Sequence, residues 1–164
     1  MKSLGYVLAL LLFLPQPPRE GKVASEYDKK ADFATYKTYT WVEGRKATVP
    51  LGHELLVKGI EKEMSARGLT KDDSGQAHLT VAYYTLRTSY VDLKEVEKLE
   101  REGYKEQAHI YDMGKLVVVV RERSTKRQLW AANTLEPLSA DPAARERTIN
   151  DAVVKLFQTY PTRK

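Results

Sequence analysis

The sequence predicts one domain of the α+β class, in which an antiparallel or mixed sheet of about five strands carries two main helices on one face. Two patterns support this prediction. Short segments rich in β-branched and aromatic residues recur along the chain, as strands require. Two longer segments repeat apolar residues at three- and four-residue steps, which is the period of a helix. Because the strands follow one another in hairpins, α+β is favoured over α/β.

The composition is that of a folded protein without cysteine chemistry. The chain has 164 residues, of which 42% are hydrophobic and 30% are charged. Its ten tyrosines and two tryptophans exclude a disordered chain, because disordered segments are poor in aromatic residues. The absence of cysteine excludes disulfides, thiolate metal sites, cysteine nucleophiles and a lipid-modified cysteine.

The net charge of +5 does not indicate nucleic acid as a partner. Basic and acidic residues are interleaved through most of the chain, whereas nucleic-acid binding requires a basic patch or stripe. The densest basic stretch lies within 121–127, and we interpret it as a polar turn between two strands.

Residues 1–20 have the layout of a signal peptide or short anchor followed by a proline-rich linker. Lys2 precedes an apolar block from Leu4 to Leu14, which is too short to span a bilayer. Prolines at 15, 17 and 18 then end any helix. No small-x-small triplet follows Leu14, so inefficient cleavage, cleavage near Gly21 and retention as an anchor all stay open. We expect export to the periplasm or cell envelope.

Elements of a single α+β domain are predicted over residues 22–161. Asp141 before Pro142 is a helix start signal, and Gly68 is a helix stop signal. The all-valine run 117–120 indicates a central strand covered on both faces. The predicted strands are 23–28, 38–42, 78–86, 116–120 and 128–132, and the predicted helices are 51–67 and 142–160.

Residues 88–113 form an excursion of uncertain structure. Leu93, Val96 and Leu99 allow a short charged helix, and 104–113 has no clear period. An irregular segment of this length inside a small domain is either functional or mobile.

The residues show no catalytic, cofactor-binding or metal-binding pattern. His53, His78 and His109 are far apart in the sequence and form no metal-ligand pair. The carboxylates of Asp72 and Asp73 are better explained by a turn than by acid–base chemistry. We therefore predict a protein without cofactors. The sequence does not identify which residues would bind a partner or ligand.

Two groups of aromatic residues could form a stacking platform, although a structural role in the core and turns is favoured. A binding surface, if there is one, is expected near the second group, which surrounds the excursion. The first group is Tyr27, Phe33, Tyr36, Tyr39 and Trp41, and the second is Tyr83, Tyr84, Tyr90, Tyr104 and Tyr111.

The beginning of the domain resembles a bacterial envelope family known as domain of unknown function 4136. The resemblance depends on three short motifs, at Tyr27–Asp28, Asp32–Phe33 and Tyr36–Trp41. Later stretches are similar too: Gly68–Leu69, Ala77–Tyr84, Leu129–Trp130 and Tyr160–Pro161. The resemblance implies an exported α+β domain, usually a lipoprotein, without an established activity. This chain lacks the lipoprotein cysteine, so the resemblance does not extend to a lipid anchor.

The function expected from the sequence is that of an uncharacterised, non-enzymatic cell-envelope domain. It would bind a partner protein, an envelope polymer or a small ligand through its sheet edge or through residues 88–113. The alternatives are an envelope hydrolase with an unrecognised site and a purely structural periplasmic protein. No nucleic-acid partner is expected, and membrane contact is expected only through the amino-terminal segment.

Overall fold

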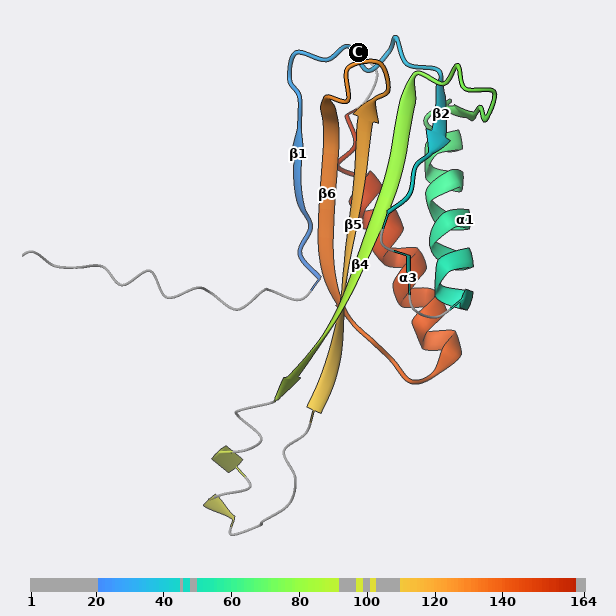
Figure 1. The fold of residues 1–164 in the computed structure, drawn as a ribbon. Helices are drawn as coiled ribbons and strands as arrows, with labels where there is room; N and C mark the ends of the chain where they lie inside the picture. Colours follow the sequence, from blue (N-terminus) through green and yellow to red (C-terminus); the bar gives the residue numbers. More distant parts are fainter. Residues whose placement is uncertain are drawn as a thin grey trace, which may run out of the picture.

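A mixed sheet of six strands carries two long helices on one face in the computed structural model, which describes residues 21–44, 46–47, 50–91, 97–98, 101–102 and 110–161 (Figure 1). The elements are β1 (Ala24–Tyr27), β2 (Thr38–Trp41), α1 (Pro50–Ala66), β3 (Thr70–Lys71), β4 (Leu79–Val91), β5 (Ile110–Glu122), β6 (Gln128–Pro137) and α3 (Pro142–Phe157). The predicted α+β class is confirmed. The sheet has one strand more than expected, because the two-residue β3 is too short to produce a sequence pattern. The predicted signal or anchor at 1–20 lies outside the described residues.

The sheet is mixed because its two ends are built differently. The strand order is β1-β6-β5-β4-β2-β3. Strands β4, β5 and β6 form an antiparallel meander to which β1 adds antiparallel. In contrast, β2 runs parallel to both of its neighbours, β4 and β3. A parallel pair needs a crossover, and α1 supplies it between β2 and β4.

The valine-rich strand β5 lies in the interior of the sheet, as its sequence predicts. Val118 and Val120 are fully buried on the face that the helices cover. Val119, which points to the opposite face, is also buried. Valines of this run are therefore buried on both faces of the sheet.

The core lies between the helices and the sheet. Ile60 and Met64 of α1 and Phe157 of α3 are fully buried in it. At the β5–β6 pairing the register shifts, so that Val120 is opposite Trp130 and Arg121 is opposite Gln128. The extra residue, Leu129, forms a β-bulge, and both it and Trp130 are fully buried.

Most of the first aromatic group belongs to this core, which agrees with the structural interpretation. Phe33, Tyr36 and Tyr39 are buried, and Trp41 is half-buried. The ring of Phe33 packs edge-on against those of Tyr36 and Tyr160. These rings hold the connection between β1 and β2 against the end of α3.

The two ends of the 88–113 excursion are strands, which corrects the expectation of an irregular segment. The β4–β5 ladder continues to the pair formed by Val91 and Ile110. Both strands are therefore longer than the predicted 78–86 and 116–120. Of the short helix predicted around Leu93, Val96 and Leu99, the structure describes only residues 97, 98 and 101, which are helical. The three named residues and Tyr104 lie outside the described residues.

Candidate functional site

The far half of the β4–β5 pairing is the first candidate site. We call residues 86–91 of β4 and 110–115 of β5 the β4–β5 ribbon. These residues pair in register, and the ribbon extends away from the helices (Figure 1). Residues 113–115 also pair with β6, so the ribbon is two-stranded only over its last three pairs, from Ser89–Asp112 to Val91–Ile110. A two-stranded ribbon is only marginally stable in water on its own.

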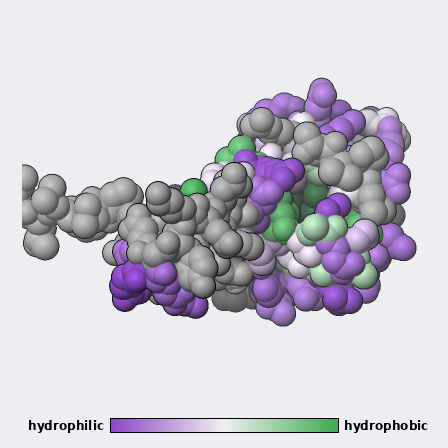
Figure 2. All heavy atoms as spheres, turned by 90° about the horizontal axis from the view of Figure 1, so that it is seen from below, coloured by the Kyte–Doolittle hydropathy of each residue, from purple (hydrophilic) through white to green (hydrophobic). Residues whose placement is uncertain are grey.

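The ribbon presents apolar side chains on the face opposite the helices. Side chains alternate between the two faces of a strand, so Leu86 and Tyr90 share one face with the cross-strand residue Tyr111. The rings of Tyr90 and Tyr111 are stacked with centroids 5.8 Å apart. Leu86 and Tyr111 are 48% and 40% exposed. Seen from below, the described surface is mostly hydrophilic and has a smaller hydrophobic area near its centre (Figure 2).

The other face of the ribbon combines an ion pair with the exposed side chain of Val91, which is 46% exposed. Arg87 donates a hydrogen bond to the carboxylate of Asp112, and the Ser89 hydroxyl donates to the same carboxylate at 2.6 Å. The hydrogen bond from Arg87, followed by that from Ser89, lowers the pKa of Asp112. Both faces therefore mix polar and apolar groups, since the face of Leu86 and Tyr111 also includes the exposed Thr88 and Lys115.

One edge of the ribbon is also unpaired. The Val42 amide donates to the Val81 carbonyl at 2.9 Å, so odd-numbered residues of β4 turn their main-chain groups toward β2. Since β2 has already ended, the main-chain groups of Arg87, Ser89 and Val91 on that side have no partner in the described part of the chain. An unpaired edge is a template for another strand.

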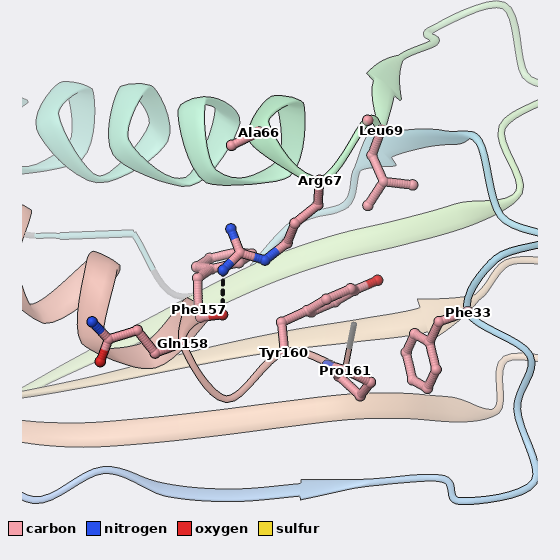
Figure 3. Close-up of a pocket in the computed structure, with 9 residues that line it drawn as sticks. Phe33, Ala66, Arg67, Leu69, Phe157, Gln158, Tyr160 and Pro161 are labelled. Atoms are coloured by element: carbon pink, nitrogen blue, oxygen red, sulfur yellow. Dashed lines mark hydrogen bonds between the residues drawn. The ribbon is translucent and has the colours of Figure 1, made fainter. Parts of the chain in front are cut away.

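A hollow of about 590 Å³ between the ends of the two helices is structural in character (Figure 3). The guanidinium of Arg67 lies over the Phe157 ring and donates to the Phe157 carbonyl. It also donates to the Glu63 carboxylate at 2.6 Å. The Arg67 guanidinium in this hollow therefore already binds groups of the protein itself.

The histidines do not assemble a hydrolase site in the described residues. His53 is hydrogen-bonded to the hydroxyl of Tyr83, and Nδ1 of His78 accepts from the Lys37 amide at 3.1 Å. Neither contacts the serine or carboxylate that a nucleophilic mechanism needs. His109 lies outside the described residues. No group of three possible metal ligands occurs in the part of the chain that the structure describes.

The carboxylates of Asp72 and Asp73 hold loop structure, as the sequence indicates. Asp72 accepts from the Ser74 amide at 2.9 Å, which closes a turn. Asp73 accepts from the Thr40 hydroxyl at 2.9 Å. They have separate partners, so they are not an acid–base pair.

Fold and surface together define a small α+β domain with an exposed ribbon formed by the ends of β4 and β5. The chain belongs to the family described as domain of unknown function DUF4136, whose model matches residues 23–162. This agrees with the resemblance seen in its opening motifs. No curated protein matches the chain.

Solved structures share the fold. A PDZ domain protein from Parabacteroides distasonis is 13% identical with a TM-score of 0.55, and the match covers 87% of this chain but 36% of that one. A PelC dodecamer from Paraburkholderia phytofirmans is 10% identical with a TM-score of 0.53, and the match covers 88% of this chain and 100% of that one. At these identities the likeness establishes the fold alone.

Proposed function

We propose that this chain is an exported cell-envelope domain that acts by binding rather than by catalysis, and that its partner is a second copy of itself. The observation that carries the proposal is the exposure of Leu86 and Tyr111 on a ribbon whose edge is unpaired. Grouped exposed apolar side chains mark interaction surfaces, and an unpaired strand edge accepts a further strand.

The chemistry of the ribbon favours a protein partner over a charged polymer. A strand from another molecule would satisfy the free main-chain groups of Ser89 and Val91, and the body of the same molecule could pack on the side chains of Leu86 and Tyr111. A charged polymer would need a row of like charges, whereas Arg87 and Asp112 neutralise each other.

A second copy is the occupant that the fold supports best. The PelC protein of Paraburkholderia phytofirmans, which shares the fold over its full length, forms a dodecamer. The fold is thus compatible with a large homo-oligomer. If the ribbon of one copy meets a different surface of the next, the contact is head-to-tail and can close into a ring.

Export is supported by the apolar block Leu4–Leu14 after Lys2 and by the envelope family that the opening motifs resemble. In the described residues, no helix has both the length and the apolar character that crossing a membrane requires. Intact-mass analysis and fractionation of the full chain, expressed in a bacterial host, test this part. A mass shortened by about twenty residues in the periplasmic fraction supports a secreted domain. A full-length protein in the cytosol contradicts export.

Light scattering coupled to size exclusion tests self-association. The double variant L86S/Y111S should be monomeric, whereas the unaltered protein should be oligomeric. Val154 on α3 is 44% exposed and gives a matched control, V154S, which should assemble like the unaltered protein. Circular dichroism checks that all three remain folded. An unaltered protein that is monomeric at high concentration, or an oligomeric L86S/Y111S variant, would overturn the proposal.

A further inference from the structure

A second hollow, of about 400 Å³, lies where the loop after β2 meets α1 and the middle of β4. Its aromatic lining is Trp41 and Tyr83, whose ring centroids are 6.3 Å apart at an interplanar angle of 87°. Val57 of α1 adds apolar surface, and Lys46 and His53 add polar groups. We call it the Tyr83 hollow.

The wall of the Tyr83 hollow requires a glycine. A Cβ added to Gly44 would lie 2.1 Å from the main-chain oxygen of Tyr83. Gly44 does not have a positive φ, so close approach rather than conformational freedom explains the residue. The loop is therefore seated directly on the backbone of β4, and this contact builds the hollow.

The polar atoms of the two aromatic residues are already engaged. The indole N–H of Trp41 donates to the Glu61 carboxylate at 2.9 Å. The Tyr83 hydroxyl oxygen lies 3.4 Å from the amide nitrogen of Ala47 and is hydrogen-bonded to Nδ1 of His53. Trp41, which is half-buried, thus offers ring surface to a ligand, whereas Tyr83 is 5% exposed and supports the Trp41 ring edge-on. Other residues must supply the hydrogen bonds.

Two nitrogen groups in this hollow are left open to a ligand. The hydrogen bond with the Tyr83 hydroxyl engages Nδ1 of His53, so Nε2 is the ring nitrogen left to contact a ligand. In the described part of the chain, neither this Nε2 nor the Lys46 ammonium has a partner. Lys71, in contrast, is balanced by Glu61 and Asp73 at 3.3 and 3.6 Å.

The helix end adds to this electrostatic character. His53 lies in the first turn of α1, which contains no acidic residue. The amino-terminal end of a helix carries partial positive charge. The same hollow also contains the exposed carboxylate of Glu43, which can accept hydrogen bonds.

We infer that the Tyr83 hollow binds a sugar ring that carries a carboxylate, such as a uronic acid unit. The carboxylate would accept from Lys46 and His53, and the ring would lie against the half-buried Trp41. Glu43 would accept from the ring hydroxyls. A bare anion would leave the aromatic surface unused, and a neutral sugar would leave the ammonium group without its counter-charge.

Fluorine NMR of the full chain labelled with 5-fluorotryptophan tests this inference, because each tryptophan gives its own signal. Trp41 lines the hollow, whereas Trp130 is fully buried and serves as an internal control. Glucuronate should shift the Trp41 signal saturably and leave the Trp130 signal in place. Glucose and acetate should bind about tenfold more weakly, since each lacks one of the two recognised features.

Single-residue variants test which groups of the hollow bind glucuronate. K46A and H53A should each weaken glucuronate binding about fivefold or more, by loss of a charged or polar hydrogen bond. Lys58, which is exposed on α1 outside the lining, gives the control K58A, which should bind normally. K46A changes an exposed side chain, so its folding is not in question. Equal binding of acetate or glucose, shifts of both tryptophan signals together, or normal binding by K46A would overturn the inference.

Discussion

The guanidinium carbon of Arg67 lies 5.1 Å from the centroid of the Phe157 ring, and the same guanidinium donates a hydrogen bond to the Phe157 carbonyl. Arg67 follows the last residue of α1, and Phe157 is the last residue of α3. The carboxyl-terminal end of a helix carries partial negative charge, which a cation stabilises. One side chain therefore joins the ends of both helices.

Removing this cation should destabilise the fold. We expect R67M to lower the free energy of unfolding by about 2 kcal/mol, because it loses charged hydrogen bonds and a cation–π contact. R67K keeps the charge but not the planar fork, so its loss should be smaller. Urea unfolding measures the stability of both variants. R147M, at an exposed position of α3, is the control. Equal stability of R67M and R147M would contradict this role.

Two glycine substitutions should have opposite effects. G44A places a methyl group 2.1 Å from the Tyr83 oxygen, so it should lower the melting temperature and disturb the Trp41 environment. In G52A, the new Cβ would lie 3.6 Å from Ala47 Cβ, an ordinary contact. Because Gly52 is within α1, G52A should stabilise the protein, by up to about 1 kcal/mol. Thermal unfolding separates the two, and a G44A protein as stable as G52A would show that the loop is not seated on β4.

Stability should fall at high pH because of Tyr39. Burial, and then the charges of Glu61 and Asp73, raise the pKa of Tyr39 from 10.0 to about 12. A pKa raised on folding contributes stability that is complete below pH 10 and is lost as the pH rises toward 12. The free energy of unfolding, measured across this pH range, should fall less steeply for Y39F than for the unaltered protein. Identical slopes would show that Tyr39 titrates alike in both states.

Stability should also fall at low pH, in part through Glu122. Hydrogen bonds from the hydroxyls of Thr125 and Tyr36 lower the pKa of Glu122 below its usual 4.5. A lowered carboxyl pKa contributes stability that is present above pH 4.5 and is lost as the pH falls through the folded-state value. E122Q should be less stable near neutral pH and should lose less on acidification. Denaturant unfolding at several pH values measures the stability of both proteins. If the two lose stability equally on acidification, Glu122 does not contribute.

Much of the fold could be predicted from the sequence because its patterns are local. The stripe that includes Ile60 and Met64 predicts α1, and Asp141 predicts the start of α3, where it accepts from the Ala144 amide at 2.7 Å. The valine run predicts an interior strand. These elements are specified by neighbours along the chain, so periodicity and capping residues are sufficient.

The length of the ribbon could not be predicted, for a physical reason. Residues 88–91 and 110–113 have mixed polar and apolar character, and they become strands because each segment pairs with the other. The strand β3 depends in the same way on its pairing with β2. Cross-strand pairing is a non-local contact, and no window of sequence contains both partners.

The same contrast between local sequence patterns and tertiary contacts applies to the candidate binding residues. The sequence by itself determined the α+β class, the interior position of β5, the structural role of Phe33, Tyr36 and Tyr39 and the resemblance to the family. Only the tertiary structure brought His53 to Tyr83 and Gly44 onto the β4 backbone, because these residues come from separate elements. A histidine or a glycine in isolation carries no signal of such a contact. Its role is fixed only by the groups that the packed helices and strands place beside it.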